Sequence, residues 1–464
     1  MYKRQLFVDP AVVPLDAWRQ WLKLEQTRPL TYVSFWLDFH LWGAQSAGFR
    51  FTNLLLHCSA ALLLLLSARR LFDGTTALLA AAVFALHPLT HEPLLYIFAR
   101  GGSLAAVFCL LSLWFWLKDK PMAAVAAFAA SLLAKEEWVA FPLALVLIDF
   151  ARARKPKWAF IAGMLVMAMA AGARVIYATK VVAGAGSGLG QQTTPWNYFL
   201  MQGEAIAGYG WRIAVPMEMS IDPPAPSDGL VVWGLLVIAV SAASWFWTRT
   251  NQSGFWLLPS FVLLLPSSSI LPAADAVAYR RMYLPMAFLA IGVVLAFRKW
   301  PRALVALLLL WTALGAARRA TWGNERAIWM EAADLAPGKL RPYLQLSRLS
   351  AKDEALRYLD KAKEIAPYDP EVASERGRVW LEAGDAAHAL PEFGRALALD
   401  PKQARHLQNR GAALLALGQT DAARADFESA LRRDPCLKPA RENLTRLGVQ
   451  LPPSTCPTTN FAVR

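Results

Sequence analysis

The chain has 464 residues, 56% of them hydrophobic, and a mean hydropathy of +0.32. This composition is too apolar for an ordinary soluble protein, and long uncharged runs account for it. The formal charge of +14 does not indicate nucleic-acid binding, because many basic residues lie in short loops between apolar segments and no basic stripe is interleaved with aromatic residues.

The first 50 residues read as a soluble loop on the outer side of a membrane. They contain neither a signal peptide nor a membrane helix. We therefore expect the chain to be truncated at its start, with a preceding membrane helix missing.

Ten apolar segments follow, and we expect them to cross a membrane as helices. Several are short for a bilayer of roughly 30 Å, so their ends should extend into the interface. They cover residues 51–67, 75–90, 103–117, 122–134, 138–150, 158–177, 229–247, 254–271, 282–297 and 303–317. Between the sixth and seventh, residues 196–216 are amphipathic and rich in Trp and Tyr, which predicts an interfacial helix.

Basic residues predict the orientation of these segments, since cytoplasmic loops carry an excess of Lys and Arg. They fall in every second loop, at Arg69–Arg70, Lys118 and Lys120, Arg152–Lys157, Arg249 and Arg298–Arg302. Those loops should be cytoplasmic, and the chain's two ends should lie on the outer face.

The outer face collects most ionisable residues that adjoin membrane segments. Charge at membrane depth is costly, so a convergent group of such residues predicts a functional site. Basic side chains there can hold a lipid-linked phosphate, and Glu or His can move a proton at an acceptor hydroxyl. The phosphate-binding candidates are Arg28, Arg100, Lys135 and Arg281, and the supporting candidates are His87, His91, Glu92, Glu136 and Tyr283.

Each candidate also has a purely structural interpretation. His87 and His91 are also explained as interfacial caps of a helix end, and Lys135 with Glu136 as an ion pair at a turn. Arg100 is equally consistent with snorkelling toward headgroups. Arg281 and Tyr283 fit an interfacial anchor pair.

Other site chemistries find little support in the sequence. His87 and His91 have the spacing of a metal-binding helix face, but Pro88 breaks the required helix and no third ligand is evident. Phosphate-loop, nucleophile-elbow and dinucleotide patterns are not found. Cys436 and Cys456 form either a disulfide or two free thiols. We predict no metal and no firm cofactor.

The C-terminal part repeats with a period of 34 residues, which is typical of the tetratricopeptide (TPR) helix–turn–helix. The matching positions are Pro367, Pro401 and Pro435; Gly377 and Gly411; Gly384 and Gly418; Ala389 and Ala423; Phe393 and Phe427; and Ala396 and Ala430. An earlier, degenerate unit supplies Ala355, Leu359 and Ala362. Because such arrays are usually binding surfaces, we expect a protein or peptide partner in the TPR groove.

Six blocks in order make the chain resemble the transmembrane O-mannosyltransferases with TPR repeats and their bacterial relatives, in the GT-C superfamily. The blocks are Arg28–Thr31; Gly48–Phe49 with Asn53–His57; His87–Pro88 with Glu92 and Arg100; Leu133–Glu136; Leu265–Ser269; and Arg281–Pro285. The resemblance implies a GT-C membrane fold, an outward-facing active site and a polyprenyl- or dolichyl-phosphate sugar donor. It also implies an acceptor presented by or near the TPRs, and a catalytic acidic pair that would lie upstream of Met1.

Four positions depart from the family's pattern. The family's His-Thr before the Glu reads Thr90-His91 here, the acid two residues after the Arg is Gly102, and the Glu two residues before the last Arg is Tyr279. Lipid-phosphate binding therefore carries over more safely than a proton-transfer role, and the catalytic residues stay unassigned.

The sequence thus predicts an all-α chain with a GT-C-like membrane domain followed by a TPR superhelix. The predicted parts are an outer loop (1–50), the membrane domain (51–317), a connecting helix (318–336), TPR repeats with a capping helix (337–448) and a disordered tail (449–464). The predicted function is transfer of a sugar, mannose being one candidate, from the lipid-phosphate donor to a protein or glycan hydroxyl outside the cytoplasmic membrane. The alternative is a non-catalytic, membrane-anchored TPR scaffold.

We expect a multi-pass protein of a bacterial inner membrane with its TPRs in the periplasm. In a eukaryote the corresponding place is the ER membrane, with luminal TPRs. Neither inverting nor retaining stereochemistry is indicated by the sequence.

Overall fold

The computed structural model describes residues 27–43, 45–178, 194–226, 229–250, 252–268 and 275–452, and within these ranges the regular elements are all helical. The chain divides into two compact units. The first comprises residues up to Met219 together with Ala225–Gly323, and the second comprises Ser220–Pro224 together with Asn324 onward. Residues 1–26 of the predicted outer loop and residues 453–464 of the predicted tail, which include Cys456, lie outside the described residues.

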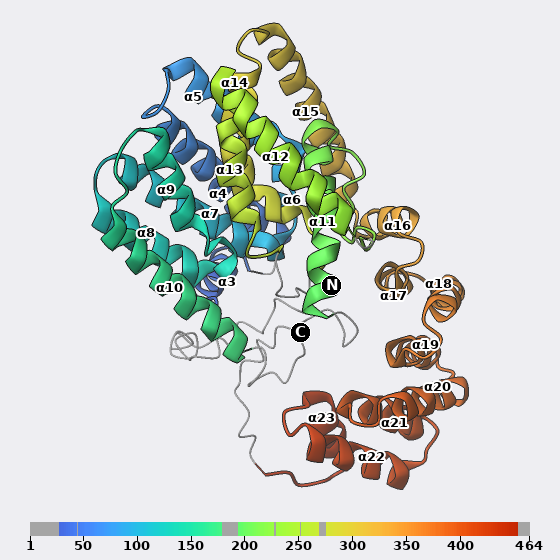
Figure 1. Ribbon diagram of the computed structural model, residues 1–464. Helices are drawn as coiled ribbons and strands as arrows, with labels where there is room; N and C mark the ends of the chain where they lie inside the picture. Colours follow the sequence, from blue (N-terminus) through green and yellow to red (C-terminus); the bar gives the residue numbers. More distant parts are fainter. Residues whose placement is uncertain are drawn as a thin grey trace. The chain divides into compact units, whose positions relative to one another are not determined.

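The first unit is built from apolar helices, and short turns join neighbours such as α7 with α8 (Figure 1). Its helices are α3 (Pro29–Trp42), α4 (Ser46–Ala68), α5 (Gly74–Leu86), α6 (Glu92–Leu95), α7 (Arg100–Leu117), α8 (Pro121–Ala134), α9 (Phe141–Ala151), α10 (Trp158–Tyr177), α11 (Pro195–Ala214), α12 (Leu230–Thr250), α13 (Leu257–Leu264), α14 (Tyr283–Ala296) and α15 (Pro301–Trp322). Several begin with proline in the first turn, where the missing N–H is not needed.

Helix lengths indicate a multi-pass membrane protein but differ from the predicted ten crossings. Among the described residues, five helices are long and apolar enough to cross a membrane, or six if the bent pair Gly74–Leu86 and Pro88–Leu95 forms one span. The helices α8 and α9 have 14 and 11 residues. At 1.5 Å per residue they reach only about 21 and 16 Å, which is less than a bilayer core of roughly 30 Å.

Two helices of the first unit lie outside the ten predicted membrane segments. α3 occupies residues assigned to an outer loop, and it packs against α4, α7 and α8. α11 covers the predicted interfacial helix, but one face is buried, with Tyr198 and Tyr209 almost fully enclosed. Each tyrosine also bonds to the backbone of the segment before α14: Tyr198 Oη donates to the Ser267 carbonyl at 2.8 Å, and the Ala278 N–H donates to Tyr209 Oη at 3.0 Å.

Two of the predicted cytoplasmic loops meet at one end of the first unit. Asp119, between α7 and α8, accepts hydrogen bonds from Arg154 at 3.0 Å and from Lys157 at 2.9 Å, both of which follow α9. These two basic residues lower the pKa of Asp119 to about 2. The excess of Lys and Arg predicted each of these loops to be cytoplasmic on its own. The ion pairs show in addition that the two loops lie at the same end of the helix bundle.

The second unit consists of TPR helix pairs. Its helices are α16 (Glu325–Leu335), α17 (Leu340–Arg348), α18 (Lys352–Ile365), α19 (Pro370–Glu382), α20 (Ala386–Leu399), α21 (Ala404–Ala416), α22 (Thr420–Arg433) and α23 (Lys438–Arg446). The repeat glycines permit close packing, because a Cβ on Gly377 would stand 2.7 Å from the Phe393 ring and one on Gly411 would stand 2.8 Å from the Phe427 ring. The same glycine–phenylalanine contact between helices therefore occurs in two successive repeats, 34 residues apart.

A short segment from between α11 and α12 belongs to this second unit. Ile221 packs against the cluster that contains Trp329 and Tyr343. Asp222 is almost fully buried and accepts a 2.7 Å hydrogen bond from Lys339 Nζ. The first TPR helices thus include a strip of chain that precedes them by more than a hundred residues.

Candidate functional site

Charged side chains gather where the ends of apolar helices meet in the first unit. We call this group the cationic cluster, and it contains four bases and four carboxylates: Arg28, Lys135, Arg280, Arg281, Glu92, Glu136, Glu137 and Asp275. All of them lie at helix ends or in turns, because a charge within an apolar helix would lose its hydration without a partner. Arg28 directly precedes α3, while Arg280 and Arg281 lie in a 3₁₀ turn before α14.

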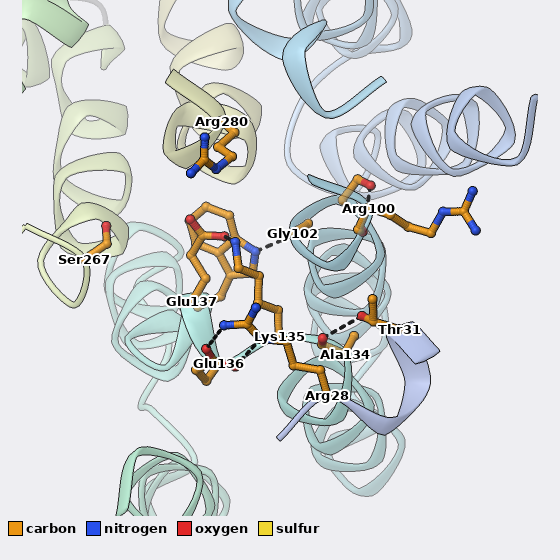
Figure 2. A network of polar contacts seen from close by, with 12 residues as sticks. Arg28, Thr31, Arg100, Gly102, Ala134, Lys135, Glu136, Glu137, Ser267 and Arg280 are labelled. Atoms are coloured by element: carbon orange, nitrogen blue, oxygen red, sulfur yellow. Dashed lines mark hydrogen bonds and ion pairs between the residues drawn. The ribbon is translucent and has the colours of Figure 1, made fainter. Parts of the chain in front are cut away.

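A turn between α8 and α9 supplies the centre of the cluster. Lys135 has an extended backbone, and Glu136–Trp138 then form a single 3₁₀ turn. Lys135 Nζ donates to Glu137 Oε2 at 2.6 Å, whereas Glu136 pairs with Arg28, whose Nε donates to Glu136 Oε2 at 3.1 Å. The ion pair considered from the sequence, Lys135 with Glu136, is therefore replaced by pairs with Glu137 and Arg28 (Figure 2).

The two arginines before α14 are held differently. Arg280 bridges two carboxylates, with Nη1 3.2 Å from Glu92 Oε1 and Nη2 2.5 Å from Asp275 Oδ2. Arg281 is almost fully buried, and its guanidinium donates to the carbonyl oxygens of Asp275 and Ala276 at 2.5 and 2.9 Å. Among the described residues, Arg281 therefore has no carboxylate within ion-pair distance.

Glu137 is the electrostatic centre of the cluster. Besides its bond to Lys135, its carboxylate interacts with the charges of Arg28, Arg280 and Arg281. Its side chain is 8% exposed, and that of Lys135 is 18% exposed. Glu137 thus interacts with all four bases of the cluster, although Arg28 and Arg280 are paired more directly with the other three carboxylates.

Two pKa values in the turn reflect this crowding. Burial lowers the pKa of the Lys135 ammonium below its usual value, and repulsion by Arg28 and Arg280 adds to the effect, while Glu137 opposes it. For Glu136, burial would raise the pKa, but attraction by Arg28 prevails and lowers it below its usual range. Lys135 is therefore a cation whose charge is costly and which a further anion would stabilise.

Gly102 leaves the space that the Lys135–Glu137 pair occupies. A Cβ on Gly102, in the first turn of α7, would stand 3.1 Å from Glu137 Oε2 and 3.7 Å from Lys135 Nζ. The Gly102 carbonyl also accepts a 3.3 Å hydrogen bond from Trp138 Nε1. The position at which the resembled family carries an acid is thus filled by a carboxylate from the neighbouring turn.

Arg100 lies apart from the cationic cluster, although the sequence grouped it there. Its guanidinium is fully buried, lies 2.5 Å from Asp38 Oδ2, and donates to Asn53 Oδ1 and to the Phe49 carbonyl, both at 2.7 Å. Figure 2 shows its side chain directed away from Lys135 and Glu137. Arg100 thereby joins α7 to α3 and α4.

The remaining candidates make structural contacts. His87 ends α5, accepts from the Leu89 N–H at Nδ1, and donates from Nε2 to the Ile213 carbonyl at 3.0 Å. His91 lies where Gly315 of α15 leaves room for its ring. Tyr283 is fully buried and its hydroxyl lies 2.9 Å from His57 Nδ1, while His57 Nε2 bonds to the Ala85 carbonyl. These contacts fix α4, α5, α14 and α15 around the cluster.

A pocket adjoins the cluster at Glu92. It has about 250 Å³ of empty volume, which includes open solvent. Glu92, Arg318 and Tyr279 supply its polar lining, and Leu89, Leu95 and Trp322 are among its apolar lining residues. No group of three or more metal-ligating side chains occurs in the part of the chain that the structure describes.

Sequence reasoning placed Arg28, Lys135, Arg281, Glu92 and Glu136 near one another, and the structure brings all five together in the cluster. It did not single out Glu137 or Asp275. Glu137 directly follows a chosen residue, and Asp275 is an isolated acid five residues before Arg280. An isolated charge close to an arginine pair is the signal that could have indicated Asp275.

Comparison with known proteins gives partial matches. No family model matches the chain. It is similar to the protein O-mannosyl-transferase TMTC1 of Mus musculus, with 34% identity over 119 residues, and to TMTC1 of Homo sapiens, with 35% identity over 118 residues; each match covers 24% of this chain and 13% of the relative. Tmtc2 of Drosophila melanogaster is 38% identical over 93 residues, 20% of this chain and 10% of that protein. The chain thus matches only a small part of these relatives' length.

Two solved structures of helical proteins also resemble the chain. The Cut9–Hcn1 hetero-tetramer of the APC/C matches with a TM-score of 0.26 and 15% identity, over 93% of this chain and 89% of that chain. Yeast Tom70 matches with a TM-score of 0.25 and 14% identity, over 85% and 88%. These scores are too low to indicate a shared fold.

Proposed function

We propose that this chain is a membrane glycosyltransferase of GT-C type that transfers a sugar, with mannose favoured by its relatives, from a polyprenyl- or dolichyl-phosphate donor to a hydroxyl. The observation that carries the proposal is the convergence of four basic side chains at these helix ends, where Lys135 pairs with the nearly buried Glu137 and, among the described residues, Arg281 is held by backbone carbonyls alone. The partial similarity to protein O-mannosyl-transferases supports a glycosyltransferase role.

The cluster has the chemistry needed to hold a phosphate. Arg and Lys form charge-assisted hydrogen bonds with phosphate oxygens, and arginine does so with two parallel donors. A bound phosphate would replace the Glu137 carboxylate beside Lys135 and would give the Arg281 guanidinium an anionic partner in addition to its carbonyl partners. The charges already present therefore favour an exchange of one anion for another.

The same cations assist the transfer itself. The acceptor hydroxyl loses its proton to a general base, which is not assigned to a residue, and its oxygen bonds to the anomeric carbon. The bond from that carbon to the phosphate oxygen breaks, and the lipid phosphate leaves with the electron pair. Cations fixed in place before the reaction stabilise that developing charge without reorganisation. Arg28, Lys135, Arg280 and Arg281 are our candidates for this role.

The surrounding helices suit a lipid donor. Spans such as Ser46–Ala68 and Tyr279–Ala296 would let a polyprenyl chain lie in the bilayer while its phosphate reaches the cluster. We place the reaction on the extracytoplasmic face, in a bacterial inner membrane or in the ER membrane. The TPR helices would hold a protein or peptide partner there.

A transfer assay on the full chain tests the proposal. The detergent-purified protein is given radiolabelled mannosyl phosphoryl polyprenol and a threonine-containing peptide. We expect labelled peptide from the wild type and a loss of about 10²–10³-fold in Arg281→Gln. The matched control is Lys120→Gln, which alters an exposed cation in the turn between α7 and α8 and should keep full activity.

Thermal unfolding of each variant separates loss of function from loss of fold. If wild-type protein neither transfers the sugar nor binds the donor, the glycosyltransferase proposal fails. The membrane-anchored TPR scaffold would then be the better interpretation. Transfer that survives in Arg281→Gln would remove this arginine from the site.

A further inference from the structure

A second group of basic residues lies in the turn between α9 and α10. Residues 152–157 contain four basic side chains and no acidic one: Arg152, Arg154, Lys155 and Lys157. We propose that this turn binds the phosphate of an anionic phospholipid headgroup, with Arg152 and Arg154 as the main donors. The inference is independent of the proposed function, because none of these residues belongs to the cationic cluster or lines the pocket beside it.

The neighbouring turn between α7 and α8 holds this basic turn in place. Arg154 Nη1 lies 3.2 and 3.0 Å from the two carboxylate oxygens of Asp119, and Lys157 Nζ donates to the same carboxylate at 2.9 Å. The Arg154 N–H donates to the Asp149 carbonyl at 2.9 Å, which closes the turn on the end of α9. Ala153 has a φ angle of +51°, a conformation that persists in a non-glycine residue only where surrounding contacts impose it. The donors are therefore oriented before a ligand arrives.

Several of these donors remain for an external anion. Arg154 uses only Nη1 on Asp119, so its Nε and Nη2 have no partner among the described residues. Arg152 has no carboxylate within ion-pair distance in that part of the chain. Burial lowers the pKa of its guanidinium, and repulsion by Arg154 adds to the effect, while Asp149 and Asp119 oppose it. A bound phosphate would relieve this repulsion, since arginine pairs with phosphate oxygens through two parallel donors.

Exposed apolar side chains on both sides of the turn favour a lipid over a soluble anion. Phe150, two residues before Arg152, and Trp158, directly after Lys157, are each more than half exposed. Trp158 begins α10, which is long and apolar enough to cross a membrane. A headgroup phosphate at the turn would place its acyl chains along such side chains, and tryptophan is enriched at this interfacial level. A soluble phosphate would gain nothing from them.

The turn between α14 and α15 provides an internal comparison. It carries two exposed bases, Arg298 and Lys299, and an exposed tryptophan, Trp300, directly before α15. Neither base forms an ion pair among the described residues, so no carboxylate orients them. General attraction between positive charge and an anionic membrane would act on both turns alike. An oriented phosphate site requires the second contact, which the turn after α9 has through Asp119.

Lipid binding to the full-length protein tests the site. The protein is delipidated in a neutral detergent, and native mass spectrometry measures its affinity for phosphatidylglycerol and for phosphatidylcholine, which differ in headgroup charge. We expect the wild type to prefer phosphatidylglycerol about tenfold or more. The double variant Arg152→Gln, Arg154→Gln should lose most of this preference. Arg298→Gln, Lys299→Gln is the matched control, because it removes the same charge and should keep the preference.

Three results would overturn the proposal. The first is equal affinity of the wild type for the two lipids. The second is an equal loss in both double variants, which would show that general charge attracts the lipid. The third is displacement of phosphatidylglycerol by an equal concentration of glycerol phosphate, which would identify a soluble anion as the occupant. Selective lipid binding by a protein that transfers no sugar would contradict the proposed function alone.

Stability measurements keep the test decisive. Thermal unfolding shows whether each variant is folded, and the exposed Arg154–Asp119 pair should contribute little to stability. If the double variant unfolds, Arg152→Gln alone repeats the measurement, because this substitution breaks no ion pair among the described residues. An unchanged lipid preference in Arg152→Gln would then contradict the proposal.

Discussion

Arg100 and Lys135 are two largely buried basic residues of the first unit whose positive charges are held in different ways. Arg100 is fully enclosed, and its donors meet Asp38, Asn53 and backbone carbonyls of α3 and α4. Within the described parts of the chain, Lys135 pairs with one carboxylate, that of Glu137, and two arginines repel it. The first arrangement binds helices together, whereas the second has cations that can change partners. Only the second is suited to a ligand that comes and goes.

Breaking the Arg100 arrangement should have the largest effect on stability. Asp38→Ala leaves Arg100 without its carboxylate in a fully buried site. Removing one partner of a buried pair costs about 3–5 kcal/mol. Thermal unfolding in detergent measures the loss, and Asp119→Ala is the control because that exposed acid should contribute about 0–1 kcal/mol. Similar unfolding temperatures for the two variants would show that Arg100 is not a structural anchor.

Substitutions in the cationic cluster should instead change phosphate affinity more than stability. The double variant Lys135→Met, Glu137→Gln removes both members of a pair and so leaves neither charge unpartnered. We expect its fold to survive and its affinity for citronellyl phosphate to be about tenfold or more below that of Glu137→Gln alone, since a charged hydrogen bond contributes about 1.5–3 kcal/mol. Calorimetric titration measures the affinity of both variants, with Lys120→Met as the control. Equal affinities of the double variant and Glu137→Gln would exclude Lys135 from phosphate binding.

The pH dependence of binding separates Lys135 from the arginines. Burial, with repulsion by Arg28 and Arg280, lowers the pKa of Lys135, so its ammonium is lost at lower pH than for a free lysine. Phosphate affinity should stay constant below that pKa and fall as pH rises through it. Because Glu137 raises the pKa of Lys135, Glu137→Gln should move the fall to lower pH. Titrations from about pH 7.5 upward avoid the phosphate's own ionisation near pH 6. An identical pH profile in the variant would contradict this account.

Local sequence pattern predicted the parts of the molecule that local forces determine. Apolar runs predicted the helices of the first unit, and the 34-residue period predicted the TPR pairs with their Gly377–Phe393 contact. Helix length gives fewer membrane crossings than the apolar segments predicted, because α8 and α9 are apolar yet too short to span a bilayer. Composition indicates where a helix forms, whereas the turns that end it decide its length.

Pairing between charges was harder to predict, because it depends on distant parts of the chain and on turn geometry. Nothing near Asp38 in the sequence indicates that it would be the partner of Arg100. In a 3₁₀ turn successive side chains point about 120° apart. Glu136 and Glu137 therefore face different partners, Arg28 and Lys135. The sequence could identify the charged turn but not the pairs within it.

The smallest expected effect is also the sharpest test of whether Glu137 competes with a ligand. In Gly102→Ala the new methyl group would stand 3.1 Å from Glu137 Oε2, so this carboxylate must shift by a few tenths of an ångström, which we expect to weaken its bond to Lys135. We expect phosphate affinity to rise by less than about tenfold, with stability within about 1 kcal/mol of wild type, because alanine also favours the helix. Gly163→Ala in α10 is the matched control, since nothing lies near its added methyl group. If Gly102→Ala weakens phosphate binding while Gly163→Ala leaves it unchanged, Glu137 assists the anion site and does not compete for it.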